Sequence, residues 1–458
     1  MTTLCKPCTV ALLQHIVSGI LKGTTVAIGH PAPRSSISSV LRVTSGNFLE
    51  MYDFMIFAYY APAIAKTFFP LQSEFASLML SLATFGAGFL MRPIGAIVLG
   101  GYSDRNGRRA GLLLTLALMA FGTLSIACTP GYRTIGILAP CLVVAGRLLQ
   151  GLSAGAELGG VSVYLSEIAP PNRKGFYVSW QSASQQMAVI FAAIISIVLI
   201  SKLSPADMAA WGWRIPLWFG CLLIPVLFLI RSSLAETEQF LARRQHPNMR
   251  QILRSLMTHW NIIAIGTMLT ALTTTAFYMI TAYTPTYGST TLHLARSSNL
   301  VVTLCVGVSN FVMLPLMGAL SDRIGRRPLL WVCTISVLLT AYPALYWLIQ
   351  SPSFARLLIV ELWLSLLYAS YNGAMVVYLT EIMPIDVRST GFSLAYSLAT
   401  ALFGGFTPAI CTFFIHATGN RAMPGAWLSV AAACALAAVA LTHSIPSLKK
   451  EQPSVIQS

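Results

Sequence analysis

Four ionisable side chains lie deep inside long apolar segments of this sequence: Asp53, Arg92, Arg147 and Glu157. At about 1.5 Å of helix per residue, Asp53, Arg92 and Glu157 lie roughly 15 to 18 Å from the nearest polar end of their segments. Arg147 lies on the same segment as Glu157, about ten residues before it and further outward. Charged side chains are costly in hydrocarbon, so each is a functional candidate.

Arg92 is the first candidate for a binding residue. A guanidinium stays charged, and its planar fork grips a carboxylate through two hydrogen bonds. Arg92 and the second deep arginine, Arg147, therefore favour an anionic substrate over a zwitterion. The structural alternative is that Arg92 only pairs with Asp53 or Glu157 and holds helices together.

The deep carboxyl groups are candidates for carrying a proton. Burial favours the neutral form of a carboxyl group, and a nearby guanidinium favours its charged form. An arginine that moves, or that binds a substrate carboxylate, would therefore load and unload the proton. Asp53 and Glu157 are the main candidates, and the alternative is a permanent ion pair. Glu50 lies one turn before Asp53 and fits an inner polar network better.

The segments that carry these side chains are long enough to cross a membrane. The chain is 56% hydrophobic and 9% charged, and its mean hydropathy is +0.71. Apolar runs of about 20 residues match a hydrocarbon core of about 30 Å. We therefore predict an all-α membrane protein with twelve spans: 43–64, 76–101, 110–129, 137–167, 178–201, 214–231, 261–284, 299–320, 328–349, 356–381, 391–416 and 425–444.

Lys and Arg are concentrated in alternate loops between these spans. The net charge of +15 does not indicate nucleic-acid binding, because the basic residues occupy short loops rather than one soluble face. Loops rich in Lys and Arg stay in the cytoplasm. This rule places both termini on the cytoplasmic side.

The chain contains one module twice. The pattern G-x-x-x-D-R-x-G-R-R occurs at 100–109 and at 318–327, in both cases between two apolar spans. A second pair, at 164–170 and 378–384, ends the fourth span of each module. We expect six-helix bundles at 39–231 and 259–445, a linker at 232–258, and cytoplasmic tails at 1–38 and 446–458. Such repeats are typical of transporters that hold substrate between the halves.

The repeated loop motif resembles the signature of the major facilitator superfamily. The stretches 46–50, 88–95, 146–151, 157–160 and 211–216 are similar to its metabolite:proton symporter branch, and 179–186, 283–288 and 371–375 are similar to transporters of citrate and tricarballylate. The resemblance implies a secondary active transporter of a bacterial inner membrane that imports a tricarboxylate with protons by alternating access. In related sugar–proton symporters a first-helix aspartate faces a fourth-helix arginine, which here corresponds to Asp53 and Arg147.

The resemblance also implies a gating role for charged residues at the cytoplasmic ends of the helices. They would form salt bridges that close the inner side in the outward-open state, although positive-inside topology alone also explains them. These residues are Asp104, Arg105, Arg108, Arg109, Glu167, Asp322, Arg323, Arg326, Arg327, Glu381 and Arg388.

Polar side chains on other spans are candidates for completing a substrate site with Arg92 and Arg147. Hydroxyl and amide groups hydrogen-bond carboxylate and hydroxyl oxygens. The alternative is a role in packing or at the membrane interface. The candidates are Gln181, Gln185, Tyr278, Tyr283, Asn310, Tyr371 and Asn372.

Glycines are frequent in the spans 76–101 and 137–167, where small residues allow helices to pack closely. They form no nucleotide-binding loop, so we expect no cofactor and an ion gradient as the driving force. Metal-ligand spacing and a catalytic constellation are likewise missing from the sequence. The expected partners are a small organic anion, protons and the lipid bilayer, and the expected form is a monomer.

Other functions remain open at this point. The same fold could carry a dicarboxylate such as an α-keto acid, or a zwitterionic osmolyte. A receptor that binds a metabolite without moving it belongs to another class, and an intramembrane enzyme to a third. The sequence offers no signalling domain for the former and no nucleophile–base pair for the latter.

Overall fold

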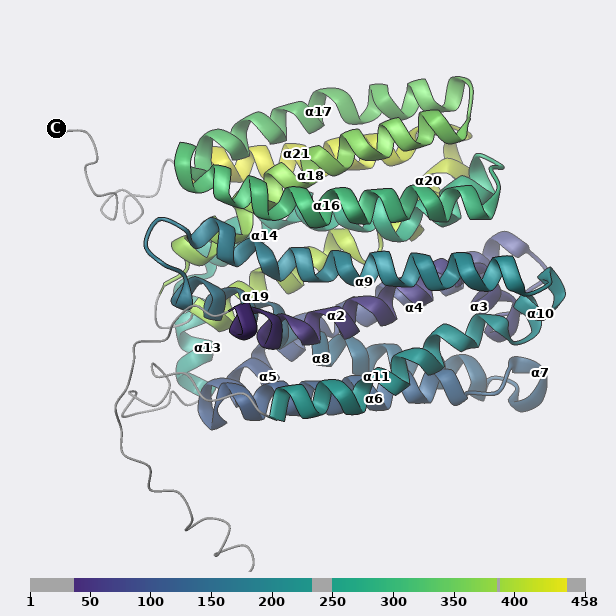
Figure 1. Ribbon diagram of the computed structural model, residues 1–458, viewed down its shortest axis with the longest axis horizontal. Helices are drawn as coiled ribbons and strands as arrows, with labels where there is room; N and C mark the ends of the chain where they lie inside the picture. Colours follow the sequence, from purple (N-terminus) through teal and green to yellow (C-terminus); the bar gives the residue numbers. More distant parts are fainter. Residues whose placement is uncertain (1–36, 233–248, 385–387, 443–458) are drawn as a thin grey trace, which may run out of the picture. The chain divides into compact units, whose positions relative to one another are not determined.

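The computed structural model describes residues 37–232, 249–384 and 388–442, and these residues fold almost entirely as helices (Figure 1). The structure does not describe the side chains of some residues inside these ranges, among them Asp104, Arg108 and Glu157. The tail 446–458, nearly all of the tail 1–38 and most of the linker 232–258 also lie outside the described residues. Within the described ranges no strand occurs.

The first part of the chain contains α2 to α11. The elements are α2 (Ile37–Tyr59), α3 (Ala61–Phe68), α4 (Glu74–Leu90), α5 (Arg92–Asn106), α6 (Arg108–Cys128), α7 (Tyr132–Ile135), α8 (Leu138–Ile168), α9 (Lys174–Lys202), α10 (Pro205–Ala210), η1 (Gly212–Arg214) and α11 (Ile215–Ser232).

The second part follows the linker. The elements are α13 (Met249–Thr258), α14 (Trp260–Phe277), η2 (Tyr278–Tyr283), α15 (Thr284–Thr286), η3 (Tyr287–Thr291), α16 (Arg296–Ile324), α17 (Arg326–Gln350), α18 (Phe354–Ile382), α19 (Arg388–Ala399), η5 (Thr400–Gly404), α20 (Thr407–Thr418) and α21 (Met423–Thr442).

Ten helical segments of the described residues are long and apolar enough to cross a membrane. The other two predicted spans correspond to α2 with α3 and to α11, which has 18 residues. The apolar character of α2 is diluted by polar residues such as Asn47, Glu50 and Asp53. The prediction of an all-α protein with twelve transmembrane helices is confirmed.

Three of the spans that we predicted as continuous helices change their winding inside the membrane. The second span breaks at Met91, between α4 and α5, where the ring nitrogen of Pro93 cannot donate a helical hydrogen bond. The seventh span passes through the π-helical turns η2 and η3, and the eleventh through η5. Such wide turns are frequent at functional sites.

Glycines bring α8 into backbone contact with α4 and α5. A Cβ atom on Gly151 would collide with the carbonyl oxygen of Gly88, and one on Gly155 with that of Arg92. Gly95 lies in the same way against the carbonyl of Leu152. The predicted close packing of these helices is confirmed, and it places Arg92 of α5 directly beside α8.

Helices from the two parts of the chain contact each other extensively. α16 packs against α9, and α19 packs against α5 and α8. Figure 1 shows α9 beside α16 and α2 beside α9. These contacts surround the side chains of α2, α5 and α8 that the sequence had singled out.

Candidate functional site

Arg92 forms a buried ion pair with Glu50. Its Nη2 atom lies 2.8 Å from Oε1 of Glu50, and the two side chains are 1% and 3% exposed. The structural alternative for Arg92 names Asp53 or Glu157 as its partner. The structure instead pairs Arg92 with Glu50 of α2, and the side chain of Glu157 lies outside the described residues.

Arg147 faces Asp53, as the resemblance implied, and Gln150 lies between them. Nη1 of Arg147 is 3.9 Å from Oδ2 of Asp53 and donates to Oε1 of Gln150 at 2.7 Å. The amide of Gln150 donates to Oδ2 of Asp53 and, at 3.0 Å, to the hydroxyl of Thr123. The glutamine therefore bridges the cation and the carboxylate.

The aromatic ring of Phe54 lies between the two ion pairs. The guanidinium carbon of Arg92 is 4.9 Å from its centroid, and that of Arg147 is 5.3 Å away. Phe89 lies under Arg92 at 4.5 Å, and Phe57 lies under Arg147 at 3.7 Å. Cation–π attraction stabilises both guanidinium groups in this water-poor region.

Both arginines retain unused hydrogen-bond donors. Within the described residues, Nε of Arg92 and both Nε and Nη2 of Arg147 are buried without a hydrogen-bond partner. Buried donors of this kind are normally paired. The geometry is therefore suited to an additional acceptor such as a carboxylate oxygen.

Tyr278 is the expected polar residue that joins this site from the second part of the chain. It begins the π-turn η2, is buried, and interacts through its hydroxyl with Arg92. Its ring packs edge-on against Phe89 with centroids 5.0 Å apart. The Arg92 pair is thus in contact with both parts of the chain.

Other expected substrate residues are buried, but several make hydrogen bonds elsewhere. The hydroxyl of Tyr371 donates to the carbonyl of Leu269, and that of Tyr283 accepts from Thr412. Asn310 accepts from Ser365 and donates to Gln186 at 3.5 Å.

The remaining expected substrate residues are buried as well. Within the described residues, both amide atoms of Asn372 and Nε2 of Gln181 have no partner. Gln185 is buried on the same helix as Gln181. The amides of Asn372 and Gln181 therefore have unused hydrogen-bonding atoms.

Sequence reasoning missed Gln150 and the aromatic residues around the guanidiniums. Gln150 follows Arg147 by three residues, so both lie on one face of α8, and this spacing was the available signal. For Phe54 and Phe57 the only signal in the sequence was that they lie close to Asp53 in α2.

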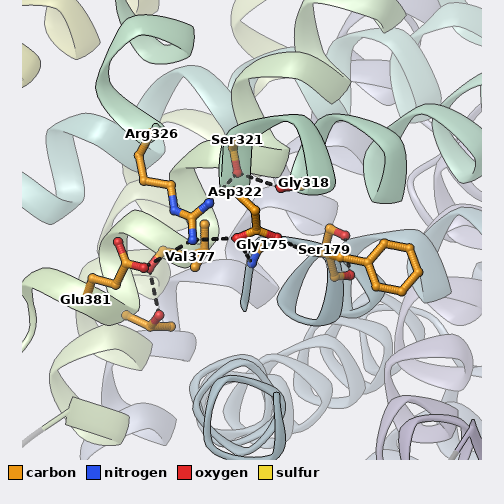
Figure 2. Close-up of polar contacts among 10 residues, drawn as sticks. Gly175, Ser179, Gly318, Ser321, Asp322, Arg326, Val377 and Glu381 are labelled. Carbon is orange, nitrogen blue, oxygen red and sulfur yellow. Dashed lines mark hydrogen bonds and ion pairs between the residues drawn. The ribbon is translucent and has the colours of Figure 1, made fainter. Parts of the chain in front are cut away.

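A second polar cluster lies where α16 ends, next to the start of α9. Asp322 accepts the backbone N–H groups of Gly175 (2.8 Å) and Phe176 (3.0 Å) at the start of α9. Arg326 reaches Asp322 at 2.7 Å and Glu381 at 3.3 Å. Figure 2 shows the guanidinium of Arg326 between the two carboxylates. We call these five residues the terminal cluster.

The terminal cluster joins the two parts of the chain. The start of a helix carries partial positive charge, so the carboxylate of Asp322 stabilises α9 from a neighbouring helix. Gly175 and Gly318 make this possible, because a Cβ on either would collide with the carbonyl oxygen of the other. A cavity of about 750 Å³ lies beside the cluster, with Lys174, Arg327 and Arg388 among its lining residues.

The other expected gating residues are not part of the terminal cluster. Arg327 donates to the hydroxyl of Tyr378 at 3.4 Å, and Arg388 to the carbonyl of Met383 at 3.4 Å. The side chains of Arg105, Arg109 and Arg323 are exposed and that of Glu167 is half-buried. Asp104 and Arg108, like Glu157 in the central site, lie outside the described side chains.

At the opposite end of α16, Arg296 provides a contact that the sequence did not predict. Its Nη2 atom donates to the carbonyl of Tyr59 at 3.2 Å, and its guanidinium lies 5.1 Å from the ring centre of Tyr60. The central site is therefore enclosed by contacts between the two parts of the chain at both ends.

The fold and the enclosed, charge-paired site define a multi-pass membrane transporter. A family model described as "Sugar (and other) transporter" matches residues 39–253 and 242–445. The chain is also similar to a solved proton:xylose symporter of the major facilitator superfamily, with a TM-score of 0.71, 20% identity, and coverage of 89% of this chain and 95% of that one. This likeness supports the fold.

Closer relatives come from two bacteria. Citrate-proton symporters of Salmonella typhi and Klebsiella pneumoniae are 58% and 59% identical over 406 and 402 residues. The matches cover 89% and 88% of this chain and 94% and 90% of the relatives. The chain belongs to the sugar and related transporter family of the major facilitator superfamily, and it is a transporter rather than an enzyme.

Proposed function

We propose that this protein imports citrate, or a related tricarboxylate such as tricarballylate, together with protons by alternating access. The observation that carries the proposal is the pair of buried arginines with unused donors at the centre of the fold. Two buried guanidiniums suit a multiply charged anion. The high identity to citrate-proton symporters along most of the chain supports citrate as the substrate class.

In this proposal, Arg92 is the primary substrate residue. A substrate carboxylate competes with Glu50 for the guanidinium, and its second oxygen uses the free Nε donor. Glu50 then loses its counter-charge and takes up a proton, because an unpaired buried carboxylate is costly. The Arg147–Gln150–Asp53 group, one turn further along α2, is the second proton-coupling candidate. Substrate binding and proton binding are thus linked through the same arginines.

The amides of Gln181, Gln185 and Asn372 and the hydroxyl of Tyr278 complete the proposed substrate site. Tyr283, Asn310 and Tyr371 would join it only after exchanging their present hydrogen bonds. The role of Glu157 as a proton carrier is retained as a proposal.

The terminal cluster is the proposed cytoplasmic gate. When it is formed, α9 and α16 are held together and the inner side is closed. The proposal includes the equivalent loop at 100–109 and the nearby Glu167, Arg323, Arg327 and Arg388. Opening breaks the cluster, and the adjacent basic cavity then offers an anion an exit lined by cations.

We further propose six-helix bundles at 39–231 and 259–445 that rock about the central site, connected by the linker 232–258. The excess of Lys and Arg in the loops next to the terminal cluster supports cytoplasmic termini in a bacterial inner membrane. A monomer contains the complete site and is the proposed functional unit. Import of a dicarboxylate, an α-keto acid or a zwitterionic osmolyte is the alternative, and a non-transporting receptor is the alternative of another class.

The deciding experiment is uptake of labelled citrate into proteoliposomes, with and without an inward proton gradient. We expect gradient-driven accumulation that unlabelled tricarballylate reduces. Arg92→Ala should abolish uptake, Asp53→Asn should retain citrate exchange but lose accumulation, and Arg133→Ala, at an exposed arginine, should resemble the wild type. A folded wild-type protein without citrate uptake would refute the substrate, and dicarboxylates and betaines would then be tested in the same vesicles.

A further inference from the structure

Glu361 is a third buried carboxyl group, which none of the roles above uses. It lies two turns into α18 and is 4% exposed. Glu50 and Asp53, the other buried carboxylates of the described residues, each face an arginine. None of the ion pairs in the described part of the chain includes Glu361.

The charges of the described interior therefore balance only when Glu361 is neutral. Arg92 and Arg147 are the fully buried cations there, and each is already opposite a carboxylate. A buried charge without a partner costs several kcal/mol, which a carboxyl group avoids by binding a proton. A neutral, protonated Glu361 fits this balance of charges.

The surroundings of Thr284 are consistent with a protonated Glu361. The hydroxyl of Thr284 lies 2.8 Å from Oε1 of Glu361 and 3.0 and 3.2 Å from the carbonyl oxygens of Ile280 and Met279. A hydroxyl has one hydrogen but also accepts hydrogen bonds, whereas a carbonyl only accepts. Thr284 can therefore donate to one of these carbonyls and accept a hydrogen bond from a protonated Oε1 of Glu361, while Oε2 of Glu361 has no partner among the described residues.

The titratable and charged groups that face Glu361 do not supply a counter-charge. Tyr287 of η3 interacts electrostatically with Glu361, and also with Cys411 of α20 and with Arg421. The phenol of Tyr287 is already engaged, because it donates to the backbone carbonyl of Arg421 at 2.8 Å, and the side chain of Arg421 is exposed. From α18 itself, Ser365 follows one turn later and donates to Asn310.

The position of Thr284 connects Glu361 to the central site. Thr284 directly follows the π-turn η2, and Tyr278, at the start of the same turn, contacts Arg92. Wide turns of this kind are frequent at functional sites. Loss of the proton from Glu361 places a charge against Thr284, and the resulting movement of η2 changes the surroundings of Arg92.

We propose that Glu361 is an additional proton-binding site that carries a proton across the membrane with the substrate. This inference rests on the proposed tricarboxylate import. A substrate with up to three negative charges moves against an inside-negative potential at a cost of ~2.3 kcal/mol per charge per 100 mV. Each further proton offsets one of these charges. A proton-binding residue in the second half of the chain therefore adds to Glu50 and Asp53 on α2.

The test measures how many protons accompany each citrate, using the full-length protein in proteoliposomes at zero membrane potential. The citrate gradient that just stops net flux is determined at a fixed pH gradient. Glu361→Gln resembles the protonated form and should retain citrate exchange. It should lower the limiting citrate gradient about tenfold per unit of the pH gradient, because one proton fewer accompanies each citrate. An unchanged limiting gradient would overturn the inference.

Two further measurements separate the remaining outcomes. Thr284→Ala removes the acceptor for the protonated carboxyl, so the pH of half-maximal uptake should fall. An unchanged pH profile would argue against the site, even if the Glu361→Gln variant does not fold. Replacing external Na⁺ with choline should leave accumulation intact, and a Na⁺ dependence that Glu361→Gln removes would assign the site to Na⁺ instead. Wild-type protein without citrate uptake refutes the proposed function itself.

Discussion

Replacing Asp322 with alanine should loosen the cytoplasmic closure by a measurable amount. The carboxylate accepts two N–H groups at the start of α9 and pairs with Arg326 at 2.7 Å. Capping and charge at a helix start contribute about 1 to 2 kcal/mol. A partly exposed ion pair adds at most about 1 kcal/mol. The closed state should therefore lose about 2 kcal/mol, which corresponds to a roughly 30-fold shift toward opening.

Hydrogen–deuterium exchange of backbone amides, followed by mass spectrometry, reports this opening without an attached probe. Peptides that cover the first turns of α9 should exchange roughly 30-fold faster in Asp322→Ala when exchange follows local opening. Asp322→Asn keeps one acceptor oxygen and should show a smaller effect. Lys202→Ala, at the exposed far end of the same helix, is the control. Wild-type exchange in Asp322→Ala would refute the idea that this contact holds the two helices together.

Three further predictions concern other parts of the molecule. Gly151→Ala should lower the melting temperature, since its Cβ would strike the Gly88 carbonyl, whereas Gly160→Ala meets open space and should raise stability by about 0.5 to 1 kcal/mol. Gln150→Ala should reduce the limiting citrate gradient in the vesicle assay more than the rate of exchange, because it removes the bridge between Arg147 and Asp53; equal losses would argue against a coupling role. Arg296→Ala should speed amide exchange around Tyr59 and leave the start of α9 unchanged, and a uniform increase would contradict separate closures at the two ends.

Much of the fold was predictable because few structures satisfy the backbone inside a bilayer. Apolar runs of sufficient length must be helices there, and the twelve spans follow from them. The breaks inside three spans were not predictable to the same degree. Pro93 marks one of them, and Pro285 and Pro408 follow the π-turns η2 and η5, but a proline does not specify which winding the helix takes.

The charged residues of the central site were predictable, and the resemblance implied the pair of Arg147 and Asp53, but the partner of Arg92 was not predictable. Depth along each helix identified Asp53, Arg92 and Arg147, since a residue's distance from a polar loop can be counted. Pairing also depends on the rotation of each helix, and one residue changes the direction of a side chain by about 100°. Arg92 therefore pairs with Glu50 rather than with Asp53, one turn away.

The glycine contacts of α8 have a consequence for how such a protein can diverge. Because α8 touches the backbone of α4 and α5, Arg92 and Arg147 belong to one rigid block and cannot be repositioned separately. Tyr278 and Asn372 lie on helices outside this block. Substitutions at these two proposed substrate residues should therefore change substrate preference without displacing the two arginines.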